Sequence, residues 1–200
     1  MVWGYYPKSF SQTLETMAAQ KPKFLLAFNE PDSKNQSNVP VAKAIEAWSE
    51  IQKLDIPLIS PSCVHADKEW MQNFMEQVDE KGLRVDAIGV HDYGGGNAAA
   101  LQAKLRRIHQ MYRRPLLITE FAVADWKAKQ VSENRHSPKK VLTFLQQMLP
   151  WLEAQDWIIG YCWFSFRPTS AAGCSSALFD EAGNLTELGE CYANFQAEQS

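Results

Sequence analysis

The sequence predicts an α/β fold in which short parallel strands alternate with amphipathic helices. Short apolar runs bounded by turn residues recur along the chain, and they have the length of buried strands. Between them lie longer segments in which apolar residues recur at helical spacing. The two kinds of segment alternate, which is the element order of a parallel sheet covered by helices.

Three strand–helix units are expected in the first half of the chain. Pro40 opens the second helix, because proline is favoured in a first helical turn, and Val41 and Ile45 lie on one face. Asp67 is expected to cap the third helix and Gly82 to end it. In chain order these elements are a strand at Val2–Tyr6, a helix at Ser11–Gln20, a strand at Phe24–Phe28, a helix at Pro40–Leu54, a strand at Pro57–Ser60 and a helix between Asp67 and Gly82.

The second half of the chain repeats the pattern in three more units. Asn97 is expected to cap one helix, in which Leu101 and Leu105 share a face, and Ser137 with Pro138 to open the next. In chain order these elements are a strand at Asp86–Val90, a helix from Asn97 through Met111, a strand at Pro115–Thr119, a helix from Ser137 through Leu152, a strand at Ile158–Phe164 and a helix at Thr186–Gln196.

Six units fit two architectures, and the pattern alone leaves both open. A doubly wound open sheet would fit, but no glycine-rich phosphate loop follows any strand, since Gly94-Gly95-Gly96 lacks the G-x-G-x-x-G spacing. A (β/α)8 barrel needs two more units and typically about 250 residues. The 200 residues therefore also fit a TIM-type barrel that lacks its first two strand–helix units.

The composition favours a single domain, residues 1–200, and excludes two classes of partner. With 46% hydrophobic residues the chain can bury a substantial core. The net charge is -3 and no run of Lys or Arg occurs, so no nucleic-acid or membrane partner is expected. Aromatic residues make up 12% of the chain, including 7 Trp. Such rings either fill a core or stack on the apolar faces of sugars.

No metal site and no cofactor is expected. The cysteines lack paired C-x-x-C spacing, so free thiols are favoured over a metal site, while a bridge between Cys174 and Cys191 stays open. Three histidines share no metal-type spacing with carboxylates. The residues set aside on these grounds are Cys63, Cys162, Cys174, Cys191, His65, His109 and His136.

Chemically active side chains gather at the ends of the predicted strands. The C-terminal ends of parallel strands lie on one face of the fold, which is where active sites form. Turn formation explains one such residue, but a set with two glutamates, an amide, an imidazole, a phenol and an indole favours catalysis. The residues at these ends are Asn29, Glu30, Ser60, Ser62, His91, Asp92, Tyr93, Glu120 and Trp163.

Glu30 and Glu120 each follow a predicted strand directly. Two carboxyl groups on rigid strands, surrounded by aromatic residues, suit glycoside hydrolysis, in which one is protonated to assist the leaving oxygen and the other is ionised. Their separation sets the outcome: about 5–5.5 Å gives retention, and about 6.5–9.5 Å leaves room for an inverting water. A turn residue or a surface ion pair is the alternative for each glutamate taken alone.

Several segments resemble one family of glycosidases in the expected order. "AFNEPD" resembles the Asn-Glu-Pro signature of clan A retaining glycoside hydrolases, and "LLITEFA" resembles their nucleophile segment. "VDAIGVHDYGG" is similar to the sixth-strand element of that clan and "GYCWFSF" to the eighth-strand tryptophan element. "MVWG", "LISPS" and "LTELG" narrow the resemblance to glycoside hydrolase family 128, which acts on β-1,3-glucans. The resemblance runs nearly end to end.

The resemblance implies a role for each matching residue. Glu30 would be the general acid/base and Glu120 the nucleophile of a retaining double displacement on β-1,3-glucan. Asn29 would hydrogen-bond the sugar 2-hydroxyl. Tyr93 would hold Glu120 ionised and correctly turned, and His91 would order the same network. A satisfied core position remains the alternative for His91.

Three tryptophans are expected to bind substrate. Trp163 would form the floor of the central sugar subsite, with simple packing as the alternative. Trp3 and Trp126 are placed only by their positions near strand ends. The alternative activities are a β-1,4-glucanase or mannanase with the same mechanism, or a non-catalytic glucan-binding protein. No protein partner is expected, and the resemblance implies a secreted or cell-wall-associated protein whose barrel begins upstream of Met1.

Overall fold

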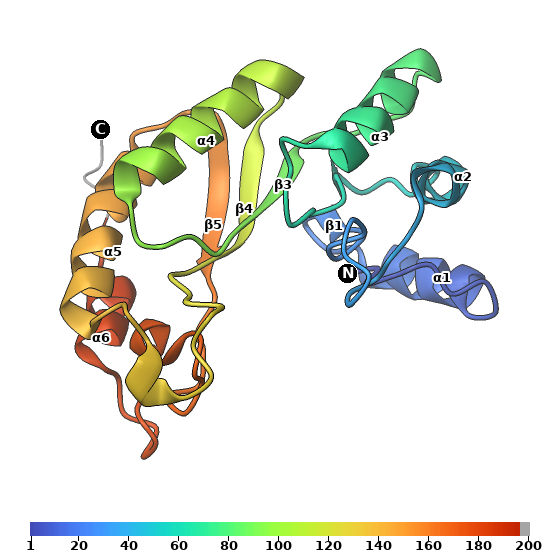
Figure 1. Ribbon diagram of the computed structural model, residues 1–200. Helices are drawn as coiled ribbons and strands as arrows, with labels where there is room; N and C mark the ends of the chain where they lie inside the picture. Colours follow the sequence, from blue (N-terminus) through green and yellow to red (C-terminus); the bar gives the residue numbers. More distant parts are fainter. Residues whose placement is uncertain (197–200) are drawn as a thin grey trace. The chain divides into compact units, whose positions relative to one another are not determined.

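The computed structural model describes residues 1–196, and it confirms an α/β fold with parallel strands. Figure 1 shows the alternation of strands and helices along the chain. In chain order the elements are α1 (Phe10–Gln20), β1 (Leu25–Leu26), α2 (Val41–Ile51), β2 (Leu58–Ile59), α3 (Glu69–Glu80), β3 (Ile88–Asp92), α4 (Ala98–Tyr112), β4 (Leu116–Phe121), η1 (Val131–Glu133), α5 (Pro138–Glu153), β5 (Ile158–Trp163), η2 (Cys174–Ser176) and α6 (Glu187–Ala193).

The chain divides into two compact units. Unit 1 contains Met1–His91 and Arg107–Thr119, and unit 2 contains Asp92–Arg106 and the residues from Glu120 onward. The strands β3 and β4 each begin in unit 1 and end in unit 2. The expectation of one catalytic domain over residues 1–200 stays a prediction.

The strands form two small sheets. β1 pairs with β2 in parallel, with Leu25 opposite Leu58, and the other sheet has the order β3-β4-β5. Single parallel bridges extend the pairing in unit 1, from Val2 to Ala27 and from Cys63 to Val90. The predicted strands at Val2–Tyr6, Phe24–Phe28 and Pro57–Ser60 are therefore present mainly as short ladders and bridges. A complete eight-stranded barrel is not formed by residues 1–196, which contribute five strands.

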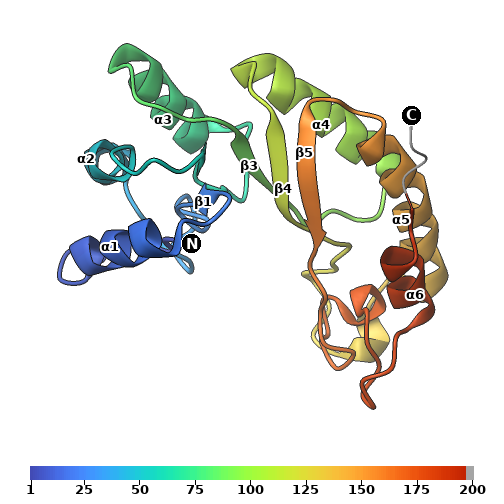
Figure 2. The same ribbon diagram turned by 180° about the vertical axis from the view of Figure 1, so that it is seen from behind.

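Aromatic rings pack together in the core of unit 1, and two helices pack together in unit 2. In unit 1 the indole of Trp48 packs edge-on against Phe74, with ring centroids 5.2 Å apart, and Trp70 stacks on the same ring at 5.5 Å. In unit 2, α5 and α6 lie side by side in both views of the ribbon (Figures 1 and 2). Fully burying one large apolar side chain contributes about 1.5–3 kcal/mol, so these clusters anchor the helices.

The predicted helix starts are confirmed where a side chain caps the helix. The Asn97 carboxamide oxygen accepts a hydrogen bond from the Ala100 amide at 3.1 Å at the start of α4. The Ser137 hydroxyl accepts one from the Lys140 amide at the start of α5. Proline in the first turn of α5 strengthens this start.

Two predicted helix limits are wrong. Asp67 was expected to cap α3, but the residue before the helix is Lys68, whose side chain makes no capping bond. The Asp67 carboxylate is instead buried in an ion pair with Arg107. The predicted helix to Gln196 ends at Ala193, in a turn closed by the Asn194 amide on the Glu190 carbonyl. Within the described residues, no helix combines the length and the apolar composition needed to cross a bilayer.

Candidate active site

The backbone around Glu30 is held from two sides within unit 1. The Asn29 amide donates to the Trp3 carbonyl at 2.9 Å, and the Glu30 amide donates to the Ser62 carbonyl at 2.8 Å. Three of the apolar residues before them are buried, namely Leu25, Ala27 and Phe28. The strand is therefore a fixed support that delivers an amide and a carboxylate at its end.

Glu30 has an unusual backbone conformation. Its φ angle is 40°, in the left-handed region that favours glycine. A non-glycine residue held there costs on the order of 1–3 kcal/mol, and it persists only where the surrounding structure fixes it. The Ser33 amide, which donates to the Glu30 carbonyl at 3.0 Å, closes the turn that imposes this conformation. The strain marks Glu30 as a candidate functional residue.

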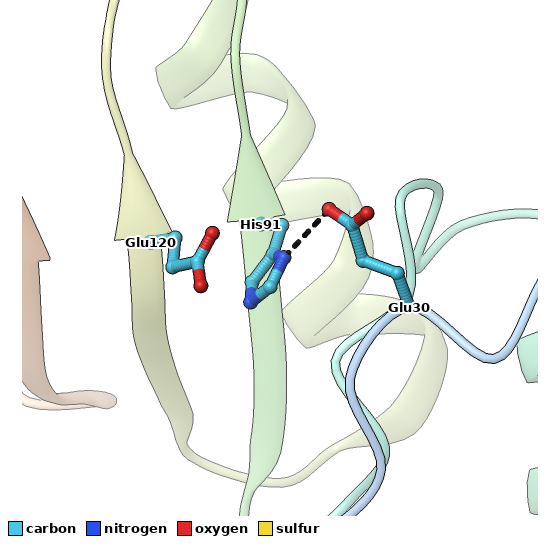
Figure 3. Close-up of side chains that lie close together, drawn as sticks. All are labelled: Glu30, His91 and Glu120. Carbon is cyan, nitrogen blue, oxygen red and sulfur yellow. Dashed lines mark hydrogen bonds and ion pairs between the residues drawn. The ribbon is translucent and has the colours of Figure 1, made fainter. Parts of the chain in front are cut away.

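His91 is the hydrogen-bond partner of Glu30. Its Nδ1 atom lies 2.9 Å from Glu30 Oε1, and the imidazole is only 2% exposed (Figure 3). Such a pair is suited to giving up and recovering a proton, which is what a general acid/base does. His91 thus has a defined polar partner in Glu30, and its role in the site stays a prediction.

Gly89 allows β3 to approach β2 closely enough to place His91. A side chain at position 89 would put its Cβ 2.3 Å from the Ser62 hydroxyl oxygen, so only glycine fits. The Gly89 amide also donates to the Ser60 hydroxyl at 2.9 Å. Ser60 and Ser62, two of the predicted strand-end residues, thus tie the strands together.

Asn29 is buried beside Glu30, and its carboxamide nitrogen donates to Gln36 Oε1 at 3.3 Å. Gln36 was not singled out from the sequence, because nothing in its surroundings departs from an ordinary loop. The Asp32 carboxylate accepts hydrogen bonds from the amides of Val64 and His65 at 2.9 and 3.1 Å. These bonds fix the loop that follows Glu30.

Glu120 lies within β4 and not directly after it, as the second-to-last residue of the strand. In unit 2 the Tyr93 hydroxyl donates a short hydrogen bond to Glu120 Oε2. The backbone brings the two together, because the Ala122 amide donates to the Asp92 carbonyl and the Ala124 amide to the Gly94 carbonyl. The hydrogen bond from the phenol fixes the orientation of this carboxylate. Figure 3 also shows Glu120 on its strand.

Asp92, the residue before Tyr93, forms an ion pair that was not predicted from the sequence. Asp92 Oδ1 lies 2.7 Å from the Lys104 ammonium, and both side chains are largely buried. Asp92 Oδ2 accepts a hydrogen bond from the Gly94 amide at 3.2 Å, which fixes the backbone on both sides of Tyr93. From the sequence, the basic cluster of Lys104, Arg106 and Arg107 is expected to form a solvated helix face, and the pair with Asp92 shows that this expectation is wrong for Lys104. The helical spacing of the basic cluster gave no sign of the pair.

Aromatic rings surround Tyr93 in unit 2. Trp126, Phe164 and Phe166 meet it edge-on, with ring centroids 5.7, 5.5 and 5.9 Å away. Trp126 is 61% exposed, as a residue that stacks on a ligand would be. Phe164 and Phe166 were not predicted as site residues, although both follow Trp163 in the segment "WFSF".

Trp163 lies in the core of unit 2. It is 7% exposed, its indole nitrogen donates to the Ser176 carbonyl at 2.9 Å, and its ring packs edge-on against Phe121. Its surroundings are those of a packing residue, and its proposed role as a subsite floor stays a prediction. Trp3, in unit 1, is 42% exposed.

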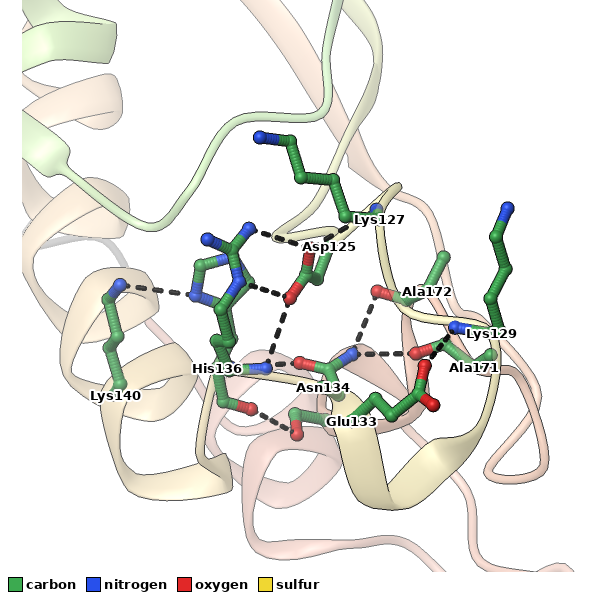
Figure 4. A network of polar contacts seen from close by, with 11 residues as sticks. Asp125, Lys127, Lys129, Glu133, Asn134, His136, Lys140, Ala171 and Ala172 are labelled. Carbon is green, nitrogen blue, oxygen red and sulfur yellow. Dashed lines mark hydrogen bonds and ion pairs between the residues drawn. The ribbon is translucent and has the colours of Figure 1, made fainter.

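A buried carboxylate anchors the loop that carries Trp126. Asp125 accepts hydrogen bonds from the Arg135 guanidinium at 2.7 and 2.8 Å and from the Lys127 amide at 3.2 Å (Figure 4). The guanidinium of Arg135 holds the pKa of this carboxyl well below its usual range. Asn134 donates to the carbonyls of Ala171 and Ala172, both at 2.9 Å. The loop is therefore fixed at both of its ends.

The fold and these contacts define a class of enzyme. The fold is a parallel α/β fold in which one glutamate is hydrogen-bonded to an imidazole and another to a phenol among aromatic rings. This combination is that of a glycoside hydrolase. The profile of the glycosyl hydrolase catalytic core matches residues 1–192, and the chain belongs to this family.

Solved structures of glycoside hydrolase family 128 are similar to this chain. An endo-beta-1,3-glucanase from Amycolatopsis mediterranei, in complex with laminaripentaose, is 28% identical with a TM-score of 0.83, over 97% of this chain and 80% of that one. An endo-beta-1,3-glucanase from Pseudomonas viridiflava is 25% identical, TM-score 0.77, over 99% and 79%. A curdlan-specific exo-beta-1,3-glucanase from Blastomyces gilchristii is 25% identical, TM-score 0.74, over 98% and 80%. No curated protein sequence matches. The predicted resemblance is confirmed.

Proposed function

We propose that this protein hydrolyses β-1,3-glucan with retention of configuration at the anomeric carbon. The observation that carries the proposal is that β3 and the residue after it supply a partner for each glutamate: His91 for Glu30 and Tyr93 for Glu120. The similar structures support the substrate, since those of family 128 include a glucanase in complex with laminaripentaose and one in complex with laminarihexaose.

The first step forms a covalent intermediate. Glu120 attacks the anomeric carbon while Glu30 gives its proton to the glycosidic oxygen, and the bond to the leaving sugar breaks. Tyr93 keeps Glu120 ionised and oriented, and His91 orients Glu30. The proposal requires carboxyl groups about 5–5.5 Å apart, which a crystal structure with bound glucan would measure.

The second step returns the enzyme to its starting state. Glu30, now ionised, takes a proton from water, and the hydroxide attacks the anomeric carbon and releases Glu120 as a carboxylate. Asn29 would hydrogen-bond the sugar 2-hydroxyl, with Gln36 fixing the orientation of its carboxamide. Trp126, Trp163 and Trp3 are the proposed substrate-binding tryptophans.

The finer architecture is also a proposal. We propose that residues 1–200 are one catalytic domain and belong to a (β/α)8 barrel lacking its first two strand–helix units. The parallel pairing in unit 1 supports this, as does coverage of only 80% of the Amycolatopsis glucanase. A secreted or cell-wall location would fit a polysaccharide substrate.

The experiment compares three glutamate variants on three polysaccharides. Glu120→Gln and Glu30→Gln are expected to lose hydrolysis of laminarin while still binding it, and the exposed Glu181→Gln serves as matched control. Proton NMR of the first product gives the anomer, which retention predicts to be β. Faster turnover of carboxymethylcellulose or mannan than of laminarin would overturn the substrate, and undiminished turnover by Glu120→Gln would overturn the mechanism.

A further inference from the structure

Two aromatic rings near the N-terminus of unit 1 are exposed and lie parallel to each other. Trp3 is 42% exposed and Tyr6 is 55% exposed. Their ring planes are parallel to within 4°, with centroids 6.5 Å apart. Tyr5, between them in sequence, is instead turned to pack edge-on against Phe10 at 5.0 Å. The chain thus directs one aromatic ring to the core and two outward.

The two rings are fixed before any ligand binds. Tyr6 lies over Gly4, where an added Cβ would be 3.3 Å from three atoms of the phenol, so the absence of a side chain lets the ring lie close to the backbone. The Ser9 amide donates to the Tyr6 carbonyl at 3.0 Å. Ordering the rings in advance lowers the entropic cost of binding.

The pair is connected to the proposed acid/base within the same unit. The Trp3 carbonyl accepts the hydrogen bond from the Asn29 amide at 2.9 Å, and Asn29 directly precedes Glu30. The pair therefore borders the segment that would hold the sugar at the bond to be cut. The hydrogen atoms of a β-linked glucosyl ring point to its two faces, which makes those faces apolar and complementary to an exposed indole or phenol ring.

We propose that Trp3 and Tyr6 form one stacking platform that binds glucosyl residues beyond the bond that is cut. Two exposed rings with parallel planes suit the apolar faces of neighbouring pyranose rings of one chain, so the platform favours longer β-glucans over short ones. This inference rests on the proposed glucanase function. It adds Tyr6 and Gly4 to the residues that determine substrate length.

The test distinguishes binding that needs the flat aromatic ring of Tyr6 from binding that needs only an apolar side chain of similar size. Tyr6→Leu keeps the bulk and loses the ring, whereas Tyr6→Phe keeps the ring and loses the hydroxyl. Each change is placed in the Glu120→Gln background, and binding of laminaritriose and laminarihexaose is measured by calorimetry. The control is Phe179→Leu, which changes an exposed aromatic residue in unit 2.

Tyr6→Leu is expected to weaken laminarihexaose binding about tenfold and laminaritriose binding much less. Tyr6→Phe and Phe179→Leu are expected to leave both unchanged. Gly4→Ala, which pushes the phenol outward, is expected to weaken laminarihexaose binding about two- to threefold. Circular dichroism melts check that each variant is folded.

The outcomes separate failure of the platform from failure of the function. If the native chain hydrolyses laminarin and Tyr6→Leu binds laminarihexaose normally, the platform is overturned and the function stands. A change in oligomeric state of Tyr6→Leu with normal glucan binding would make the rings a protein interface and also overturn it. If the native chain neither binds nor cleaves laminarin, both proposals fail.

Discussion

The two glutamates are held in different ways, Glu30 in unit 1 mainly by backbone and Glu120 in unit 2 mainly by side chains. Glu30 sits in a strained turn against a buried imidazole, whereas Glu120 lies in a regular strand and meets a phenol bordered by exposed aromatic rings. A proton donor needs a defined partner, and a nucleophile needs a fixed direction of attack. The contrast fits the two tasks proposed for these residues, proton donation by Glu30 and nucleophilic attack by Glu120.

The largest expected effect is a difference in kcat between variants of the two glutamates. Glu120→Gln is expected to lower kcat about 10⁴-fold or more on every substrate, because the nucleophile is needed in both steps. Glu30→Gln is expected to lower kcat about 10²–10⁴-fold on laminarin, yet far less on an aryl β-glucan whose leaving group needs no proton. Equal losses on both substrates would contradict the assignment of Glu30 as acid/base. Steady-state kinetics on both substrates measure this.

The next comparison concerns the partners of the glutamates. Tyr93→Phe is expected to lower kcat about 10²-fold with little change in the melting temperature, because it removes the hydroxyl bonded to Glu120 and keeps the ring contacts with Trp126 and Phe164. His91→Phe is expected to lower both kcat and the melting temperature. The substitution removes the buried imidazole, and with it a hydrogen bond to the Glu30 carboxylate worth about 1.5–3 kcal/mol. The two variants are compared by kinetics and thermal melts. A Tyr93→Phe enzyme with native kcat would show that the phenol contact is not catalytic.

A smaller effect is expected at the ion pair behind Tyr93. Asp92→Asn leaves the Lys104 ammonium largely buried without its carboxylate, and it is expected to cost about 1–2 kcal/mol and lower kcat several-fold. Glu46→Gln, which removes the exposed pair with Lys43, is the control and is expected to cost under about 1 kcal/mol. Urea unfolding monitored at pH 7 measures both.

The smallest expected effect is a pH dependence confined to unit 2. Burial and the neighbouring Lys140 ammonium lower the pKa of His136, with Asp125 and Arg135 also near it. The folded state therefore prefers neutral His136, so its contribution to stability is full above the usual histidine pKa of about 6.5 and is lost as pH falls below it.

His136→Gln is expected to flatten the decrease in melting temperature between pH 7.5 and pH 5 by about 2 °C. His65→Gln, at an exposed histidine of unit 1, is the control and should follow the native curve. A native curve that is already flat over this range would contradict the expected role of His136.

Several residues at or near strand ends could be located from the sequence because one local rule governs them. An apolar run followed by polar residues locates Asn29, His91 and Tyr93 at strand ends, and parallel strands bring such ends to one face. The contacts of His91 with Glu30 and of Tyr93 with Glu120 follow from that rule together with the short spacing between His91 and Tyr93.

The ion pairs were not predicted from the sequence, because they depend on which segments meet in three dimensions. The Asp92–Lys104 and Asp125–Arg135 pairs join residues whose spacing carries no local signal. The same is true of Asp67, which was expected to cap a helix and instead pairs with Arg107. The strained backbone of Glu30 is imposed by tertiary contacts that no residue pattern reveals.

The left-handed conformation of Glu30 determines which substitutions at this position are tolerated best in the folded protein. Glycine occupies a φ of 40° without strain, so Glu30→Gly is expected to be about 1 kcal/mol more stable than Glu30→Ala, although both lack the carboxylate. Among variants that lack the carboxylate, a library screened only for survival at high temperature would therefore favour glycine over alanine at position 30. Engineering a more robust form of this enzyme requires that every round also be screened for turnover.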